Sequence, residues 1–280
     1  MKALVTGAGG QLGRALVASL GASARPLTRG DLDVTDAAAV SAVVHSVRPD
    51  VVINATAYNK VDAAESEIEA AFAVNATAVL NLALAARRGG ALFVHVSTDY
   101  VFDGTASRPY VEDDTPRPIN AYGRSKRAGE MMVEAVGAPA LLVRTSGVFG
   151  PGGSRAKGGS FVDRILERAR TGAALRVVDD QRFAPTYAPD LAAAIVGLIA
   201  SGATGTVHVA NEGACSWYEL AVAALELASV RARVDRISSA ELAAPARRPG
   251  YSVLSSARYT QRTGLPLRPW PAALEEMLGR

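Results

Sequence analysis

Short apolar runs alternate with amphipathic stretches through the first half of the chain. The apolar runs predict buried strands at Ala3–Val5, Val51–Ile53, Leu92–Val96 and Leu141–Val143. The stretches between them predict helices at Gln11–Leu20, Ala37–Val47 and Glu67–Arg87. Continuous apolar strands separated by helices are typical of a parallel sheet that is covered on both faces. We therefore predict an α/β fold built on a doubly wound parallel sheet.

The second half of the chain has a less regular pattern. Ala174–Val178 and Leu191–Ala200 predict a strand and a helix that return to the sheet, within residues 174–205, and the glycine-rich stretch Pro151–Gly159 predicts a loop. We expect residues 1–150 to form a nucleotide-binding domain and residues 151–280 to form mainly a smaller, intertwined substrate-binding lobe. Such a lobe would cover the carboxyl ends of the strands, where these sheets bind ligands.

Composition narrows the class of protein. The 280 residues are 49% hydrophobic and 20% charged, which indicates a folded globular chain. The net charge of +3 is small and dispersed, so it suits an anionic small ligand and does not indicate a nucleic-acid partner. Cys215 is the single cysteine, no signal peptide is apparent, and the apolar stretch at Leu191–Ala200 is shorter than the ~18 residues of a membrane span. We expect a cytoplasmic protein without a membrane segment.

A glycine-rich turn follows the first predicted strand. Gly7, Gly10 and Gly13 give G-x-x-G-x-x-G, which differs from the common G-x-G-x-x-G but allows the same tight turn and close approach of backbone to a pyrophosphate. The helix that starts at Gln11 and Leu12 would present free N–H groups to the phosphates. The alternative is an ordinary strand-to-helix turn. The position after a buried N-terminal strand favours a Rossmann dinucleotide site.

Other segments are candidates for contacts with the cofactor. Asp33 and Val34 lie about 20 residues beyond the glycines, where an acidic residue often meets the ribose or adenine. Arg29 is either a solvated loop charge or a partner for a 2′-phosphate, and the second role would favour NADPH while leaving NADH possible. Further candidates follow the strand at 51–53, where small residues would let the cofactor lie flat: Ala55, Ala57 and Tyr58.

Tyr122 and Lys126 form a Y-x-x-x-K pair, which on a helix would share one face. A nearby cation should lower the tyrosine pKa from ~10, so that Tyr122 could give a proton to a ketone oxygen near neutral pH. Most isolated pairs of this kind are surface contacts. Here, however, Thr98 ends a predicted strand, and its hydroxyl would bond the same oxygen.

With these residues in place, the chain resembles the dTDP-4-dehydrorhamnose reductase family of the extended short-chain dehydrogenase/reductase superfamily. The segments that carry the resemblance span nearly the whole chain: Gly10–Gly13, Asn54–Glu65, Ser97–Gly104, Pro116–Lys126, Arg144–Ser146, Asp180–Gln181, Pro185–Thr186, Ser216–Glu219 and Ala246–Pro249. The resemblance implies a catalytic triad of Thr98, Tyr122 and Lys126, with Lys126 also holding the nicotinamide ribose. We expect NADPH as the cofactor, with NADH possible, and a monomer or homodimer as the assembly.

Three departures from the family pattern fall in the expected substrate lobe. Gly147 stands where the family usually has tryptophan, Ser160 where it has asparagine, and Phe183 where it has glycine. We expect Phe183 to refill part of the space beside Gly147. The expected substrate-binding residues are Thr98, Asp99, Gly147, Ser160, Phe161 and Arg247, with Arg247 or Arg248 suited to a sugar diphosphate.

The leading functional hypothesis is reduction of the 4-keto group of a dTDP-linked 6-deoxyhexose, with dTDP-4-dehydro-L-rhamnose giving dTDP-L-rhamnose. The alternatives are a ketoreductase for a modified dTDP-deoxysugar of a secondary metabolite and a non-catalytic NADP-binding regulatory subunit. Sugar-nucleotide 4,6-dehydratases carry Asp-Glu after the threonine, whereas Asp99 is followed by Tyr100, so elimination of water would lack its base. His45, His95 and His208 lack metal-ligand spacing and are interpreted as structural or surface residues, so no metal is predicted.

Overall fold

The computed structural model describes residues 1–153 and 159–279. Its centre is a six-stranded sheet in the order β10-β5-β4-β3-β1-β2, and every neighbouring pair is parallel. The strands are β1 (Ala3–Thr6), β2 (Ala24–Leu27), β3 (Val51–Asn54), β4 (Leu92–Thr98), β5 (Ala140–Thr145) and β10 (Gly205–His208). The predicted doubly wound parallel sheet is confirmed. Its strand order reverses between β1 and β3, where such sheets open a ligand crevice.

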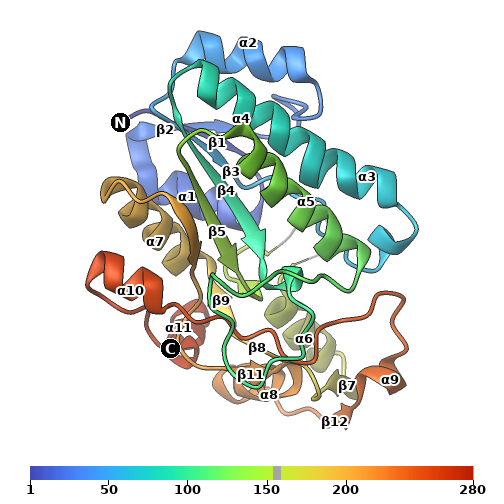
Figure 1. The fold of residues 1–280 in the computed structure, drawn as a ribbon. Helices are drawn as coiled ribbons and strands as arrows, with labels where there is room; N and C mark the ends of the chain where they lie inside the picture. Colours follow the sequence, from blue (N-terminus) through green and yellow to red (C-terminus); the bar gives the residue numbers. More distant parts are fainter. Residues whose placement is uncertain (154–158, 280) are drawn as a thin grey trace.

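Helices cover both faces of the sheet (Figure 1). The helices are α1 (Gln11–Leu20) and α7 (Ala188–Ala200) on one face, and α2 (Ala37–Val47), α4 (Ala78–Arg88) and α5 (Ala121–Val136) on the other. Side chains alternate along a strand, so Val5 packs in the cluster with α1 and α7, whereas Leu4 packs with the opposite helices. Both clusters are fully apolar, which explains the continuous hydrophobic runs.

One long helix carries a local change of winding. Residues Ile68–Arg88 comprise α3 (Ile68–Phe72), a π turn η3 (Ala73–Thr77) and α4. Among the described residues this helix alone is long and apolar enough to cross a membrane by length and composition, so a longer apolar segment exists than the one considered at Leu191–Ala200. The buried alanines, valine and leucine of α4 pack on the sheet, and a core helix passes the same test. The feature is therefore weak support for a membrane span.

The remaining elements build a lobe below the carboxyl ends of the strands in Figure 1. They are β6 (Val148–Phe149), α6 (Phe161–Arg170), β7 (Leu175–Val178), β8 (Arg182–Phe183), β9 (Thr186–Tyr187), β11 (Cys215–Ser216), α8 (Trp217–Leu227), β12 (Val234–Ile237), α9 (Ser239–Leu242) and α11 (Trp270–Met277). The helix α10 (Ala257–Thr263) packs instead on β10 and α7, beside the central sheet. Short 3-10 turns are η1 (Gly21–Ser23), η2 (Ala63–Glu65) and η4 (Asp99–Val101).

The return of the chain to the sheet differs from the prediction. The strand expected at Ala174–Val178 is β7, which pairs with β12 inside the lobe and not with the central sheet. The helix expected at Leu191–Ala200 is α7, which packs on the sheet as predicted, and the strand that returns to the sheet is β10, which pairs with β5. Both halves of the chain thus contribute to the sheet, and the domain boundary at residue 150 stays a prediction. The loop expected at Pro151–Gly159 lies largely outside the described residues.

Candidate functional site

The glycine turn after β1 lies against the loop after β3. Gly7 has φ +72°, and a Cβ atom there would lie 2.7 Å from the carbonyl carbon of Ala55, so only glycine fits. No side chain caps the N-terminus of α1, which starts after Gly10. The first turn of the helix, with Gln11 and Leu12, therefore keeps its N–H groups available to an anion. The Gln11 side chain itself donates to Gly150 O at 3.1 Å and so connects α1 to the segment that follows β6.

The end of β2 lies beside this turn, because the Ala8 N–H donates to Leu27 O. Arg29 is exposed two residues further on. The Asp33 carboxylate accepts from the backbone N–H and the hydroxyl of Thr35, at 2.9 and 2.7 Å. These hydrogen bonds, with the nearby Arg29, lower the pKa of Asp33. The exposed cation Arg29 and the exposed anion Asp33 both lie in the segment after β2, while Val34 is buried.

The loop after β3 is held by the π turn of the long helix. Asn75 accepts from the Tyr58 N–H at 2.9 Å, and its amide donates to Tyr58 O and to the Ser125 hydroxyl of α5. The Tyr58 hydroxyl donates to Glu67 at 2.8 Å. Ala57 is exposed. The buried Thr56 hydroxyl has no partner, so the loop presents an unsatisfied polar atom beside the glycine turn.

The two catalytic candidates on α5 lie beside the end of β4. Asn120 caps the helix by accepting from the Gly123 N–H at 2.7 Å, which fixes the first turn that carries Tyr122. The Tyr122 ring meets the Tyr100 ring edge-on at 5.9 Å, and the Thr98 side chain lies close enough to the phenol to influence its pKa. The structure thus brings Thr98 and Tyr122 together as predicted.

The expected lowering of the Tyr122 pKa by Lys126 is wrong. Burial raises the pKa of Tyr122 to about 12, the hydrogen bond with Thr98 opposes this shift, and the negative charge of Asp99 adds to it. The reason lies in the direction of the lysine. Lys126 Nζ donates to Val96 O at 2.7 Å and lies 3.3 Å from His95 Nε2, so it faces β4. Burial lowers the pKa of Lys126 to about 8, against the attraction of Glu130.

Asp99 faces the protein interior. It is 3% exposed, and its carboxylate accepts hydroxyl hydrogens from Thr98 at 2.9 Å, Ser146 at 2.7 Å and Ser252 at 2.5 Å. Burial raises the pKa of Asp99, and these three hydrogen bonds oppose the rise. Asp99 was expected to bind substrate. Its oxygens are instead occupied, and it ties the end of β4 to the loop after β5 and to the C-terminal loop.

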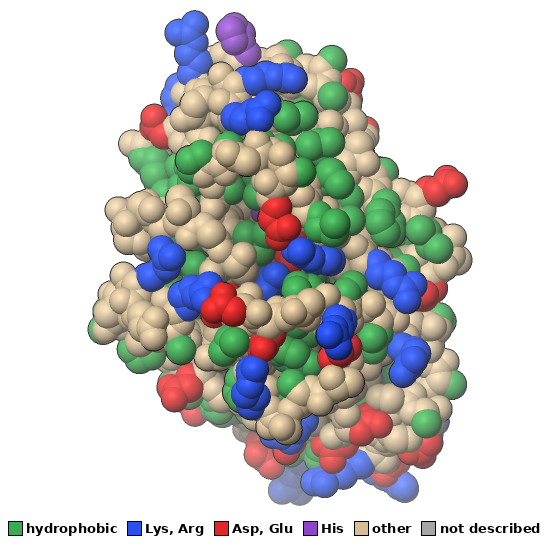
Figure 2. Space-filling view, viewed as in Figure 1, with side chains coloured by type: hydrophobic (Ala, Val, Ile, Leu, Met, Phe, Trp, Pro, Cys, Tyr) green, Lys and Arg blue, Asp and Glu red, His purple; other side chains and the backbone are tan. Residues whose placement is uncertain are grey.

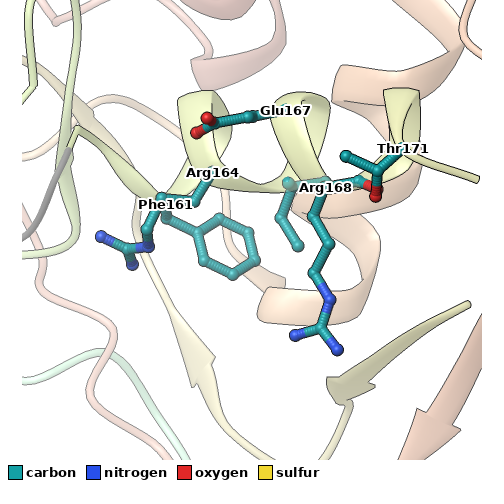
Figure 3. Close-up of a pocket in the computed structure, with 6 residues that line it drawn as sticks. Phe161, Arg164, Glu167, Arg168 and Thr171 are labelled. Carbon is teal, nitrogen blue, oxygen red and sulfur yellow. The ribbon is translucent and has the colours of Figure 1, made fainter. Parts of the chain in front are cut away.

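Ser160 and Phe161, which were expected to bind substrate, lie at the start of α6. Ser160 is the N-cap of that helix and forms a reciprocal capping pair with Asp163, so its hydroxyl is already used. Phe161 is half-buried against Trp217, with ring centroids 4.8 Å apart. It also lines a surface pocket of about 490 Å³ on α6, where Arg164 and Arg168 lie beside it and Glu167 points away from them (Figure 3). The lining of this pocket does not include the catalytic candidates.

Gly147 and Phe183 lie in contact. Gly147 follows Ser146 directly and has φ +50°, and the Phe183 ring occupies the space that a Cβ atom at 147 would need. Phe183 in turn stacks on Trp217 with ring centroids 4.0 Å apart. The Phe183 ring therefore lies beside the residue that follows Ser146, whose hydroxyl donates to Asp99. The expected contact between positions 147 and 183 is present.

The two arginines of the C-terminal loop have different surroundings. Arg248 makes two short contacts with Asp62, at 2.6 and 2.7 Å, so it is committed to a protein carboxylate. Arg247 is exposed, and its carbonyl accepts from the Asn120 side chain at 2.7 Å. This bond places Arg247 at the start of the catalytic helix. Acidic and basic side chains mingle across the middle of the face in Figure 2, and neither sign forms a continuous patch there.

Sequence reasoning missed His95. It was interpreted as a structural or surface residue and is indeed fully buried, but its position beside Lys126 was not anticipated. Its position three residues before Thr98, on the strand that delivers the threonine, was the available signal. Among the described residues, no group of three or more metal-ligating side chains is assembled.

Comparison with known proteins agrees with this geometry. The family model described as "RmlD substrate binding domain" matches residues 1–280. The chain is 40% identical to the dTDP-4-dehydrorhamnose reductase of Burkholderia thailandensis, over 98% of this chain and 97% of the relative. It is 39% identical to the dTDP-4-keto-6-deoxy-D-glucose reductase of Streptomyces niveus, over 98% and 95%.

Among solved structures, the dTDP-4-dehydrorhamnose reductase of Bacillus anthracis in complex with NADP superposes with a TM-score of 0.94 at 37% identity. The match covers 99% of each chain. The resemblance drawn from the motifs is therefore confirmed: the chain belongs to the RmlD substrate binding domain family, together with the dTDP-4-dehydrorhamnose reductases.

Proposed function

We propose that this protein is an NADPH-dependent ketoreductase that reduces the 4-keto group of a dTDP-linked 6-deoxyhexose, with dTDP-4-dehydro-L-rhamnose as the substrate. The observation that carries the proposal is that Thr98 and Tyr122 lie together at the carboxyl end of β4, in a parallel sheet whose first strand is followed by an uncapped glycine turn. Family membership and the relatives named above support it. The NADP complex of the Bacillus anthracis relative supports the choice of cofactor.

The residues present fit a dinucleotide. A side chain at Gly7 would fill the cradle between β1 and the loop after β3, the first turn of α1 is uncapped, and the Thr56 hydroxyl is an orphaned polar atom beside both. We assign the pyrophosphate to the turn at residues 7–13, the 2′-phosphate to Arg29 and the nicotinamide ribose to Lys126. When NADPH is bound there, it supplies the hydride.

The proton for the product comes from Tyr122. With its pKa raised to about 12, the phenol is protonated throughout the neutral range, so it can donate to the carbonyl oxygen while the carbonyl carbon accepts the hydride. The resulting phenolate then recovers a proton from solvent. A hydroxyl has one hydrogen to give, and the Thr98 hydrogen now goes to Asp99. Thr98 therefore reaches the ketone only by turning away from Asp99, which keeps two serine donors.

A panel of dTDP-4-keto sugars, scored for NADPH consumption by the purified chain, tests the proposal. Consumption with dTDP-4-dehydro-L-rhamnose, and loss of that consumption in Tyr122→Phe, is the expected result. Binding of NADPH without consumption with any sugar would contradict it and favour the non-catalytic regulatory subunit.

A second candidate is a ketoreductase for a different or modified dTDP-deoxysugar. The Gly147–Phe183 contact favours it, because this pair changes the wall beside the catalytic strand end. The printed name of the Streptomyces niveus relative also differs in its sugar. In the same panel, a preference for a sugar other than dTDP-4-dehydro-L-rhamnose would select this candidate.

A further inference from the structure

The first turn of α1 carries a charge of the unfavourable sign for its place in a helix. No acidic residue occurs in this turn, which has the sequence Gln11, Leu12, Gly13 and Arg14. The aligned peptide dipoles give the amino end of a helix a partial positive charge, which an acidic side chain stabilises and a cation opposes. Arg14 therefore adds a guanidinium to the positive end of α1, and an anion bound there would relieve the repulsion.

Hydrogen bonds hold this guanidinium at the glycine turn. Arg14 Nη1 donates to Gly9 O at 2.6 Å, and Gly9 directly precedes Gly10, the N-cap of α1. Arg14 Nη2 donates to Gly153 O at 2.9 Å and to Pro151 O at 3.5 Å. All three acceptors are neutral carbonyl groups, so they fix the position of the side chain without cancelling its charge.

Arg14 differs from several other arginines of the fold in its partners. Within residues 1–153 and 159–279, no Asp or Glu side chain pairs with it, and the sequence of residues 154–158 contains neither acid. Arginines with similarly reduced exposure pair with a carboxylate: Arg144 with Glu130, Arg248 with Asp62 and Arg268 with Asp190. A cation that is partly removed from water and has no counterion favours the binding of an anion.

The segment at residues 150–153, after β6, is shaped around this side chain. Gly152 has φ +69°, and a Cβ atom there would lie 2.8 Å from Arg14 Nη2, so a side chain at position 152 would meet the guanidinium. Gln11 lies three residues before Arg14, on the same face of α1, and donates to Gly150 O at 3.1 Å. The two side chains thus hold the segment beside the first turn of α1, and Arg14 forms part of the wall of that turn.

We propose that Arg14 is a further cofactor-binding residue: its guanidinium, held at the glycine turn by three carbonyls, supplies positive charge that attracts the diphosphate of the dinucleotide. The inference rests on the proposed function, which assigns that diphosphate to residues 7–13. The role differs from that of Arg29, because the diphosphate is common to NADPH and NADH, whereas the 2′-phosphate belongs to NADPH alone.

The affinities of three ligands test the role of the charge. Arg14→Gln removes the charge and keeps hydrogen-bond donors, whereas Arg14→Lys keeps the charge. Isothermal titration calorimetry with NADPH, NADH and ADP-ribose, which all contain the diphosphate, measures binding without any sugar. We expect Arg14→Gln to weaken all three by a similar factor, roughly three- to tenfold, and Arg14→Lys to retain most of the affinity.

Arg88→Gln is the matched control. Arg88 is an exposed arginine at the end of α4, next to the amino end of β4 and therefore at the opposite edge of the sheet from the glycine turn. Its substitution removes one positive charge from the protein, and it should leave the three affinities unchanged. The melting temperatures of the ligand-free proteins show whether each variant is folded.

The salt dependence of ADP-ribose binding is a readout that a purely structural role would not move. Dissolved ions screen the attraction between charges, so the logarithm of Kd should rise less steeply with the logarithm of salt concentration in Arg14→Gln than in the wild type or Arg14→Lys.

Three outcomes would overturn the proposal. Unchanged affinities in Arg14→Gln would remove the residue from the site, and a loss confined to NADPH would assign it to the 2′-phosphate. Equal losses and equal salt slopes in the Gln and Lys variants would mean that Arg14 only holds the segment at 150–153. These titrations need no turnover, so a protein that binds ADP-ribose but reduces no sugar would contradict the proposed function and leave the comparison at Arg14 decisive.

Discussion

The ring of Phe183 fills the space that a side chain at position 147 would enter, and Gly147 has a backbone conformation, φ +50°, that suits glycine. The two residues lie on different elements, one in the turn after β5 and the other on β8. Ser146 precedes the glycine and binds Asp99, which binds Thr98. The contact thus connects the unusual positions 147 and 183 with the end of β4 through Ser146, Asp99 and Thr98.

Gly147→Trp should lower both stability and turnover, because the new side chain meets Phe183 and the positive φ costs a further ~1–2 kcal/mol. Gly147→Trp with Phe183→Gly should recover part of the turnover, since the aromatic volume is then moved and not added. The backbone strain remains, so recovery should be incomplete. Melting temperatures and kcat/KM for both proteins, with Phe183→Gly as the control, check this. Equal behaviour of the single and double variants would mean that the two positions do not compensate.

Lys126 should make the stability of the protein depend on pH above neutrality. Its pKa is about 8 when folded and 10.5 when exposed, so between these values the unfolded chain binds more protons and stability rises with pH. Relative to Lys126→Met, the wild-type unfolding free energy should rise by roughly 3 kcal/mol between pH 8 and 10.5 and stay level below pH 8. Urea titrations at several pH values measure it, with exposed Lys60→Met as the matched control. A constant difference across the window would refute the burial of the ammonium.

Much of the nucleotide-binding half could be predicted from the sequence, because its strands are continuous apolar runs and its turn needs glycine at Gly7. The arrangement of the substrate lobe was harder to predict. The segment at 174–178 has the pattern of a buried strand, but whether it joins the central sheet or pairs with β12 depends on a partner 59 residues away. Short strands such as β8 and β11 have two residues each and leave no periodicity to detect.

The site shows the same division. The spacing of Tyr122 and Lys126 places them on one helix, as expected, but the direction of the amine is set by β4 and not by the helix. The His95 ring lies 3.2 Å from the Asn54 amide of a neighbouring strand, a contact between residues 41 positions apart. The occupation of Asp99 by Ser146 and Ser252 is likewise a tertiary effect. Such long-range partners influence the pKa values of buried groups such as Asp99, and a local sequence pattern does not predict them.

Arg29→Ala should weaken NADPH binding by about two- to fivefold and leave NADH binding nearly unchanged. The guanidinium is exposed, so its attraction for a 2′-phosphate is screened and modest. Asp31 and Asp33, both exposed, oppose it by repelling the same phosphate. Fluorescence titrations with each cofactor measure the change, and Arg25→Ala, which removes another exposed cation from β2, is the control. An unaltered ratio of the two affinities would remove Arg29 from the cofactor site.

The most direct test of the account is the reduction of dTDP-4-dehydro-L-rhamnose by the wild-type protein and by Tyr122→Phe, followed as NADPH consumption. Removing the phenol removes the proton donor but leaves the glycine turn and Lys126, so NADPH affinity should be retained while turnover falls by ~10²–10⁴-fold. A Tyr122→Phe protein that binds NADPH and turns over at a rate near the wild type would contradict the central claim that Tyr122 supplies the proton.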